Sequence, residues 1–169
     1  MKVHIGRYPK NPEKPRKISV RIDHYDIWGM DHTLALIIVP MLKLLKEKKH
    51  GVPDVDDADV PEELRSKPEH LDSIGLEAFE AKEAKWNYIM DAMIYSMTES
   101  MNDYEGEKVA WERVGEMDFE SMKESKKDGL TELKWKVEPI FHREIADAYF
   151  EKVRFGHCMF GKYFSALWD

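Results

Sequence analysis

The sequence lacks most of the residue patterns that indicate a catalytic or redox function. It contains a single cysteine, Cys158, so it can form neither an intramolecular disulfide nor a cysteine-based zinc site. It also has no Gly-rich phosphate loop, no Gly-x-Ser-x-Gly elbow, no Cys-x-x-Cys and no His-Glu-x-x-His. We expect a protein of a reducing compartment, with Cys158 as a small core residue within an apolar run.

Long hydrophobic runs are missing as well. The longest apolar stretch, Leu34 to Leu42, is about half of what a membrane-spanning helix needs. The first residues, Met1 to Lys17, are polar and rich in proline, which does not fit a signal peptide. The sequence therefore predicts a soluble protein that is neither secreted nor transmembrane.

The charge is unevenly distributed along the chain. The net charge of the 169 residues is −7, but residues 1–24 carry +5 and the remainder carries −12. A basic arm can contact nucleic acid or an acidic partner, and it can equally be a solvated hairpin whose lysines protect an edge strand. Because the remaining −12 would repel a duplex, we rank nucleic-acid binding last among the functions considered.

Alternating apolar residues predict short strands near the N-terminus. Val3 and Ile5 form one alternating stretch, and residues 18–22 form a second, separated from the first by a proline-rich loop. A third stretch, Glu132–Val137, has the same period, and we expect it to pair with the first two. We thus predict a basic β-hairpin arm at about residues 1–24, within a single domain that covers residues 1–169.

Apolar residues at helical spacing predict three main helices. The first begins near Asp31 or Thr33 and ends by His50–Gly51, the second covers about 76–101, and the third runs from about Pro139 to Leu167. The first helix is apolar almost all round, so we expect it at the centre of the core, wrapped by the other two. The fold class is then α+β and helix-dominant, with a small antiparallel sheet of two or three strands.

The segment between the second and third helices has weaker patterns. Short helices around Lys108–Val114 and Phe119–Ser125 are compatible with it, and Asp128–Gly129 is typical of a turn.

One cluster of side chains has metal-binding chemistry. Two histidines and two aspartates fall within nine residues, and a further ligand could come from a long helix, such as Asp91 or His142. The candidate metal ligands are His24, Asp26, Asp31, His32 and Asp91. In the competing interpretation Asp31 caps the first helix, Asp26 closes a turn, and His32 bonds a backbone carbonyl.

Methionine and tryptophan are both abundant. Met90, Met93, Met97 and Met101 form a stripe beside Trp86, which favours core packing over an adaptable binding face. Tryptophans often anchor protein interfaces. The candidates for exposed anchors are Trp28, Trp111 and Trp168.

Residues 25–42, Tyr-Asp-Ile-Trp-Gly-Met-Asp-His-Thr-Leu-Ala-Leu-Ile-Ile-Val-Pro-Met-Leu, resemble an uncharacterised protein family of tailed bacteriophages. The likeness continues through Lys49–Pro53, Asp56–Leu64, Trp86–Ile94 and Phe160–Trp168, and so covers most of the chain. It implies a phage origin and work in the host bacterial cytoplasm or in the virion. It implies no activity, so no catalytic residue can be carried over.

Two functions remain in competition. The first, which we favour, is a non-catalytic phage accessory or virion-associated protein that binds a host or phage protein, with no cofactor. The second is an enzyme that hydrolyses a nucleotide or phosphoester with a divalent metal held by the cluster at residues 24–32, where the metal lowers the pKa of a bound water. The sequence determines neither a partner nor an oligomeric state.

Overall fold

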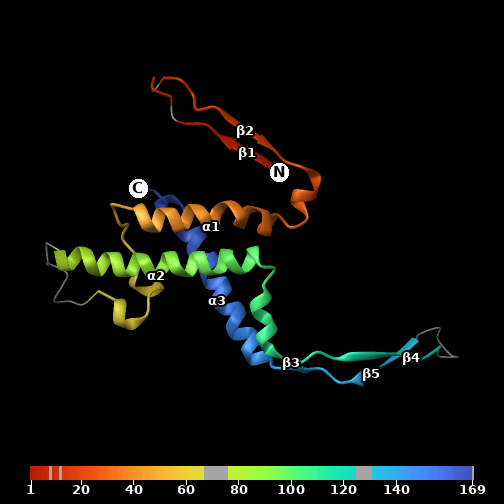
Figure 1. Ribbon diagram of the computed structural model, residues 1–169. Coiled ribbons are helices and arrows are strands. Elements are labelled where there is room, and N and C mark those ends of the chain that lie inside the picture. The colour runs from red at the N-terminus through yellow and green to blue at the C-terminus, as the bar shows by residue number, and fades with distance from the viewer. Residues whose placement is uncertain (8, 12, 67–75, 125–130, 169) are drawn as a thin grey trace.

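A computed structural model of the chain describes residues 1–7, 9–11, 13–66, 76–124 and 131–168 (Figure 1). The long helices are α1 (Met30–Lys48), α2 (Leu76–Met101) and α3 (Arg143–Lys162). The strands are β1 (Lys2–Ile5), β2 (Ile18–Arg21), β3 (Trp111–Arg113), β4 (Glu116–Glu124), β5 (Thr131–Val137) and β6 (Ile140–Phe141). The predicted helix-dominant α+β class is confirmed, and the predicted second helix coincides with α2.

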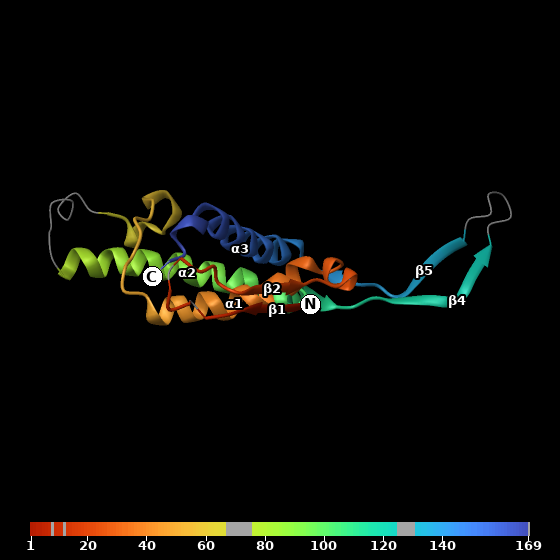
Figure 2. The same cartoon turned by 90° about the horizontal axis from the view of Figure 1, so that it is seen from above.

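The central helix of the fold is α2. Figures 1 and 2 show α1 and α2 side by side, with α3 crossing α2, and both α1 and α3 pack on α2. Four large side chains of α2 are at most 1% exposed: Trp86, Ile89, Met90 and Met93. They form the core with Leu42 of α1, Val60 of the following loop, and Met159 and Tyr163 near the end of the chain. The core interpretation of Met90 and Met93 is therefore confirmed.

The prediction that the first helix lies at the centre is wrong. Only Ala35, Val39 and Leu42 of α1 are buried. Apolar side chains on its other faces remain in solvent, among them Met41 at 64% exposure. The physical reason is that α1 contacts α2 along one stripe, so among the described residues much of its other apolar surface is left exposed to solvent.

The crossing of α2 and α3 depends on Gly156. A Cβ atom at this position would lie 2.1 Å from the backbone oxygen of Ala92 and 2.6 Å from Oγ of Ser96. A side chain would push the helices apart, so glycine is required here. Cys158, two residues on, is exposed, and its expected place in the core is therefore wrong.

The strands form three separate antiparallel pairs, β1–β2, β3–β6 and β4–β5. The predicted strand at residues 132–137 exists as part of β5, but its predicted pairing with the N-terminal strands is wrong. It pairs with β4, which precedes it closely in the chain, and short loops cost less closure entropy than long ones. The β4–β5 ribbon extends away from the helices (Figure 2).

The segment after α2, whose sequence patterns are weak, is mostly extended where the structure describes it. A 3-10 turn, Glu105–Ala110, leads into β3, and β4 replaces the short helix expected from Phe119 onwards. The turn expected at residues 128–129 lies outside the described residues. Within the ranges that the structure describes, no helix has both the length and the apolar character needed to cross a bilayer.

Candidate binding surfaces

An apolar groove runs between α1 and the C-terminal end of the chain. Its volume is about 730 Å³, and every residue that lines it is apolar. These residues are Leu34, Ile38, Met41, Leu42, Leu45, Phe160, Phe164, Leu167 and Trp168. Such a groove lacks the convergent polar groups that a catalytic site would need.

Two local features build this groove. Along α1, Leu34, Ile38, Met41 and Leu45 recur at three and four residues, so they lie on one stripe. After α3, a 3-10 turn (Phe164–Ala166) turns the chain back, with the Ala166 N–H donating to the Tyr163 carbonyl at 2.9 Å. This turn brings the last side chains of the chain alongside α1.

The walls of the groove are exposed to solvent. Met41, Phe164 and Trp168 are 64%, 65% and 61% exposed. Together with the other lining residues they form one contiguous apolar surface, and such surfaces on soluble proteins mark interaction sites. Of the predicted anchors, Trp168 is thus the one that lies in this groove.

An acidic segment, residues 54–63, lies beside the end of α3. Lys162 contacts Asp59 at 2.5 Å and Asp56 at 3.3 Å, and the Tyr163 hydroxyl donates to Asp59 at 2.6 Å. Two hydrogen bonds lower the pKa of the Asp56 carboxyl. The larger effect comes from the Ala58 N–H and the smaller from Lys162. The hydrogen bond that Lys162 donates to the Asp59 carboxylate raises the pKa of Lys162.

Two lysines of α2 hold the same acidic segment from its other side. Lys82 lies 2.7 Å from Asp54, and Lys85, which is buried, pairs with Asp57. The hydrogen bonds from these lysines are the main cause of the lowered pKa values of Asp54 and Asp57. The segment is therefore ion-paired to α2 and α3.

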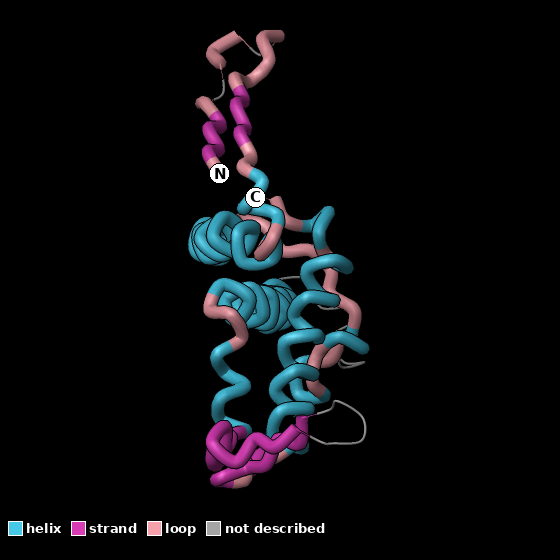
Figure 3. The backbone as a smooth tube through the Cα atoms, turned by 90° about the vertical axis from the view of Figure 1, so that its right-hand side faces the viewer, coloured by secondary structure: helices cyan, strands magenta, loops and turns pink. Residues whose placement is uncertain are grey.

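The β1–β2 ribbon is the second apolar surface. Its register pairs Val3 with Val20 and Ile5 with Ile18, and side chains of paired residues share one face. These four side chains are 41%, 55%, 51% and 64% exposed, respectively. The ribbon stands clear of the helices (Figure 3), so no described residue outside the ribbon covers its apolar face.

The predicted metal ligands of residues 24–26 have other partners. The Asp26 carboxylate accepts a charged hydrogen bond from the amino group of Met1 at 3.0 Å and a bond from the Asp23 N–H at 2.7 Å. The bond from the amino group is the main cause of the lowered Asp26 pKa. His24 Nδ1 lies 3.3 Å from Asp23. The side chains of His24 and Asp26 therefore both make contacts at the base of the β1–β2 ribbon.

Asp31 belongs to a chain of polar contacts that joins all three long helices. The Tyr104 hydroxyl donates to Asp31 at 3.2 Å and lies 2.9 Å from Ser100 Oγ, which is 3.1 Å from His157 Nε2. Burial lowers the pKa of His157. Sequence reasoning missed this cluster because its members come from different elements. Ser100 is 2% exposed, and Asp31 bonds Tyr104 rather than His157, so the contacts tie the helices together and do not form a catalytic triad.

His32 faces the turn that ends α2. Its Nδ1 lies 3.5 Å from a carboxylate oxygen of Asp103. In this turn the backbone φ is positive at Asp103 (52°) and at Tyr104 (56°). Neither Asp31 nor Thr33 caps α1, because the cap position is Gly29. This turn places Tyr104 against Asp31 and Ser100.

The remaining predicted ligands lie apart from these. Asp91 of α2 pairs with Lys46 of α1 at 2.5 Å, and His142 Nε2 lies 2.9 Å from Glu112. In the part of the chain that the structure describes, no three His, Cys, Asp or Glu side chains are placed to hold a metal ion. The metal site remains a prediction that awaits a metal assay.

The three predicted tryptophan anchors do not share a surface. Trp28 is 84% exposed in the turn before α1, and Trp111 packs on Phe141 with ring centroids 4.6 Å apart. Figure 1 places the start of α1, β3 and the C-terminus in different parts of the molecule. The three tryptophans therefore belong to separate parts of the molecule.

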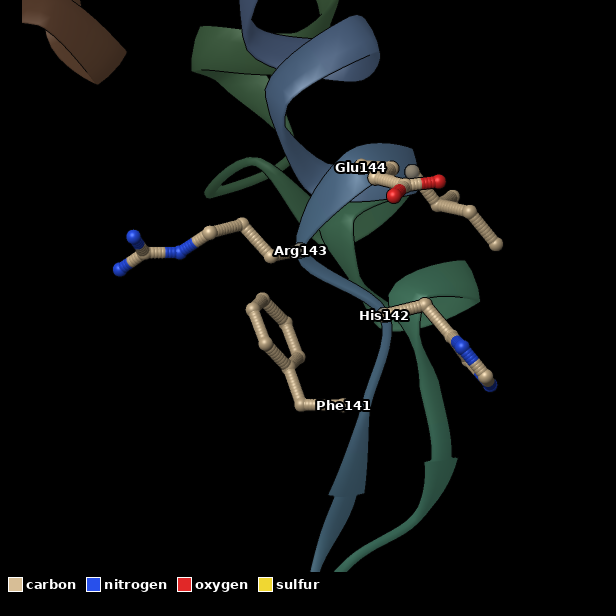
Figure 4. Close-up of a pocket in the computed structure, with 5 residues that line it drawn as sticks. Phe141, His142, Arg143 and Glu144 are labelled. Carbon is tan, nitrogen blue, oxygen red and sulfur yellow. The ribbon is translucent and has the colours of Figure 1, made fainter.

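A small pocket at the start of α3 carries no reaction centre. The labelled side chains of Phe141, His142, Arg143 and Glu144 point in different directions (Figure 4). Convergent groups are what a reacting atom requires, and none converge here.

No protein-family model, no curated protein and no solved structure matches this chain, so the evidence about its function is its own sequence and geometry.

Proposed function

We propose that this chain is a non-catalytic protein that binds another polypeptide through the groove between α1 and the C-terminal end of the chain. The observation that carries the proposal is the uncovered apolar surface of α1 and residues 160–168. Partner segments with apolar side chains can fill such a groove, and large aromatic side chains on its rim supply much of the binding energy.

The charges around the groove favour a partner with a basic end. The neighbouring segment 54–63 holds six carboxylates and no lysine or arginine. Three lysines, Lys82, Lys85 and Lys162, pair with four of these carboxylates, which leaves an excess of negative charge. We therefore expect a partner segment that combines apolar side chains with lysines or arginines beyond them.

The resemblance to a phage family adds a setting to this proposal. It supports an accessory protein or virion component that works in the host cytoplasm or in the particle, and its partner is then a host or phage protein.

The proposal is tested with a photo-reactive amino acid in place of Met41 in the full chain. Irradiation in a lysate and mass spectrometry identify the adduct, and the identified protein is then purified and titrated. We expect Met41→Asp to weaken its binding at least tenfold. Leu36→Asp is the matched control, because Leu36 is exposed on α1 but does not line the groove. The proposal fails if Met41 yields no adduct with any polypeptide, or if both variants bind as the parent does.

The alternative of a metal-dependent hydrolase has its own test. It predicts bound metal in the purified protein and loss of that metal in His32→Ala. Unchanged metal content and unchanged hydrolysis of screened phosphoesters would remove it.

A further inference from the structure

We infer that the polypeptide in the groove is a second copy of this chain, which inserts its β1–β2 ribbon while receiving the ribbon of the first. This inference rests on the proposed function and names its partner. It joins two exposed apolar surfaces of the described residues, the groove and the apolar face of the ribbon.

The ribbon needs a cover that the described part of its own chain does not provide. A two-stranded ribbon is marginally stable in water unless one face packs against another element. Here one face carries Val3, Ile5, Ile18 and Val20, all more than 40% exposed. The register places the polar pairs Lys2–Arg21 and His4–Ser19 on the opposite face. The ribbon is therefore amphipathic, with a ready-made docking face.

The ribbon's apolar face fits within the stripe of α1. Val3 and Ile5 lie ~7 Å apart along the strand at the usual rise of a strand. The stripe of α1 from Leu34 to Leu45 spans ~16 Å at the rise of a helix. Two strands are about 5 Å apart, so the ribbon is wide enough to contact α1 and the C-terminal residues together.

The charges are complementary as well. The loop between the two strands, residues 6–17, carries five lysines or arginines and one glutamate. The segment at residues 54–63 carries six carboxylates. When a ribbon lies along the groove, its basic loop can extend toward this segment, and oppositely charged surfaces attract over about 10 Å at ordinary salt.

The base of the ribbon keeps it away from its own groove. The amino group of Met1 is paired with Asp26, with its nitrogen 2.8 Å from Oδ2. The Asp23 N–H donates to the same carboxylate. With the base held in this way the ribbon stands off α1 (Figure 3), so the ribbon that enters the groove comes from a second copy. Exchange between two copies is reciprocal, which closes the assembly as a symmetric dimer.

The first experiment measures oligomeric state by light scattering and sedimentation over a range of protein concentrations. We expect a dimer for the full chain and at least tenfold weaker association for Val20→Asp in the ribbon and for Met41→Asp in the groove. The controls, Ser19→Asp on the polar face of the ribbon and Leu36→Asp on α1, should dimerise as the parent does. Circular dichroism and thermal unfolding confirm that each variant is folded.

The second experiment identifies which copy supplies the ribbon. A chain with a photo-reactive residue at position 20 is mixed with a 15N-labelled chain that lacks it, and the adducts are mapped. Labelled peptides from residues 34–45 or 160–168 support exchange between copies. If no adduct carries label although the labelled chain is in large excess, the ribbon folds onto its own chain and the inference is overturned.

Two other outcomes would also overturn it. A parent chain that remains monomeric has no exchange, and loss of dimer in Val20→Asp but not in Met41→Asp indicates that ribbons pair with ribbons. A monomer whose Met41 still crosslinks to a different protein would remove this inference and leave the proposed function standing.

Discussion

Helices α1 and α2 lie side by side, yet their burial contrasts with their composition. α1 contains the most apolar stretch of the chain but buries Ala35, Val39 and Leu42 alone. α2 carries charged residues along much of its length but buries four large side chains completely. The difference teaches that position decides burial here. α2 is covered by α1 and by α3, whereas α1 has a neighbour on one side and an open groove on the other.

The sharpest way to break this comparison is to truncate one methionine on each helix. Met90 of α2 is fully buried and Met41 of α1 is 64% exposed. We expect Met90→Ala to lower the free energy of unfolding by about 2 to 5 kcal/mol, because it removes core contacts and leaves a cavity. Met41→Ala should change it by less than about 0.5 kcal/mol. Urea unfolding checks both values, and equal losses would contradict the arrangement.

The second test concerns the close contact between α3 and α2 at Gly156. Gly156→Ala should lower the free energy of unfolding by about 1 to 3 kcal/mol, because the new methyl group would collide with Ala92 and Ser96 of α2. Gly161 has no atom within 4 Å of a Cβ position. Gly161→Ala should therefore stabilise the helix by about 0.5 to 1 kcal/mol. Opposite signs in thermal unfolding are the expected result, and a stabilised Gly156→Ala would refute the close crossing.

A smaller effect comes from the ion pairs that hold the acidic segment against α2. The lysine partners lower the pKa of Asp54 and Asp57 in the folded chain relative to about 3.9 in the unfolded chain. A carboxyl whose pKa is lower in the folded chain stabilises the fold at any pH above its pKa in the unfolded chain. That stabilisation is lost as the pH falls through its pKa in the folded chain. Asp57→Asn should therefore lower the melting temperature at pH 6 and converge with the parent below about pH 4. A difference that stays constant down to acid pH would show that the ion pair with Lys85 does not contribute.

The smallest expected effect is on Cys158, which lies on the exposed side of α3. Its thiol should react with a disulfide reagent in the native protein without prior unfolding, and Cys158→Ser should leave the melting temperature unchanged. A thiol that reacts only in denaturant would place Cys158 in the core after all.

Much of the secondary structure was predictable because its signals are local. The stripe of Trp86, Met90 and Met93 predicted α2 and its buried face, and the alternation of Val3 and Ile5 predicted a strand. The end of the chain was less predictable. Helical spacing extended the last helix from about Pro139, whereas Ile140–Phe141 pairs with β3 and α3 begins at Arg143. The start of α3 was decided by the pairing of residues 140–141 with β3, which is distant in the sequence.

The candidate site was only partly predictable for a similar reason. Trp168 was a candidate anchor because tryptophan suits interfaces, and Phe160 and Phe164 lie within the predicted third helix. Their role in a groove was missed because α1 was expected to be covered. The chain of contacts through Ser100, Tyr104 and His157 carries no sequence signal, since its members come from separate elements.

The sequence by itself determined the three long helices, the strands β1, β2 and β5, the basic N-terminal arm and the absence of an intramolecular disulfide, because period, charge and residue type act over a few neighbouring residues. Only the tertiary structure decided which helix lies at the centre, which strands pair, and which apolar surface stays open. Those outcomes depend on which elements fit against one another, as α3 fits against α2 at Gly156, and helical period does not encode that fit.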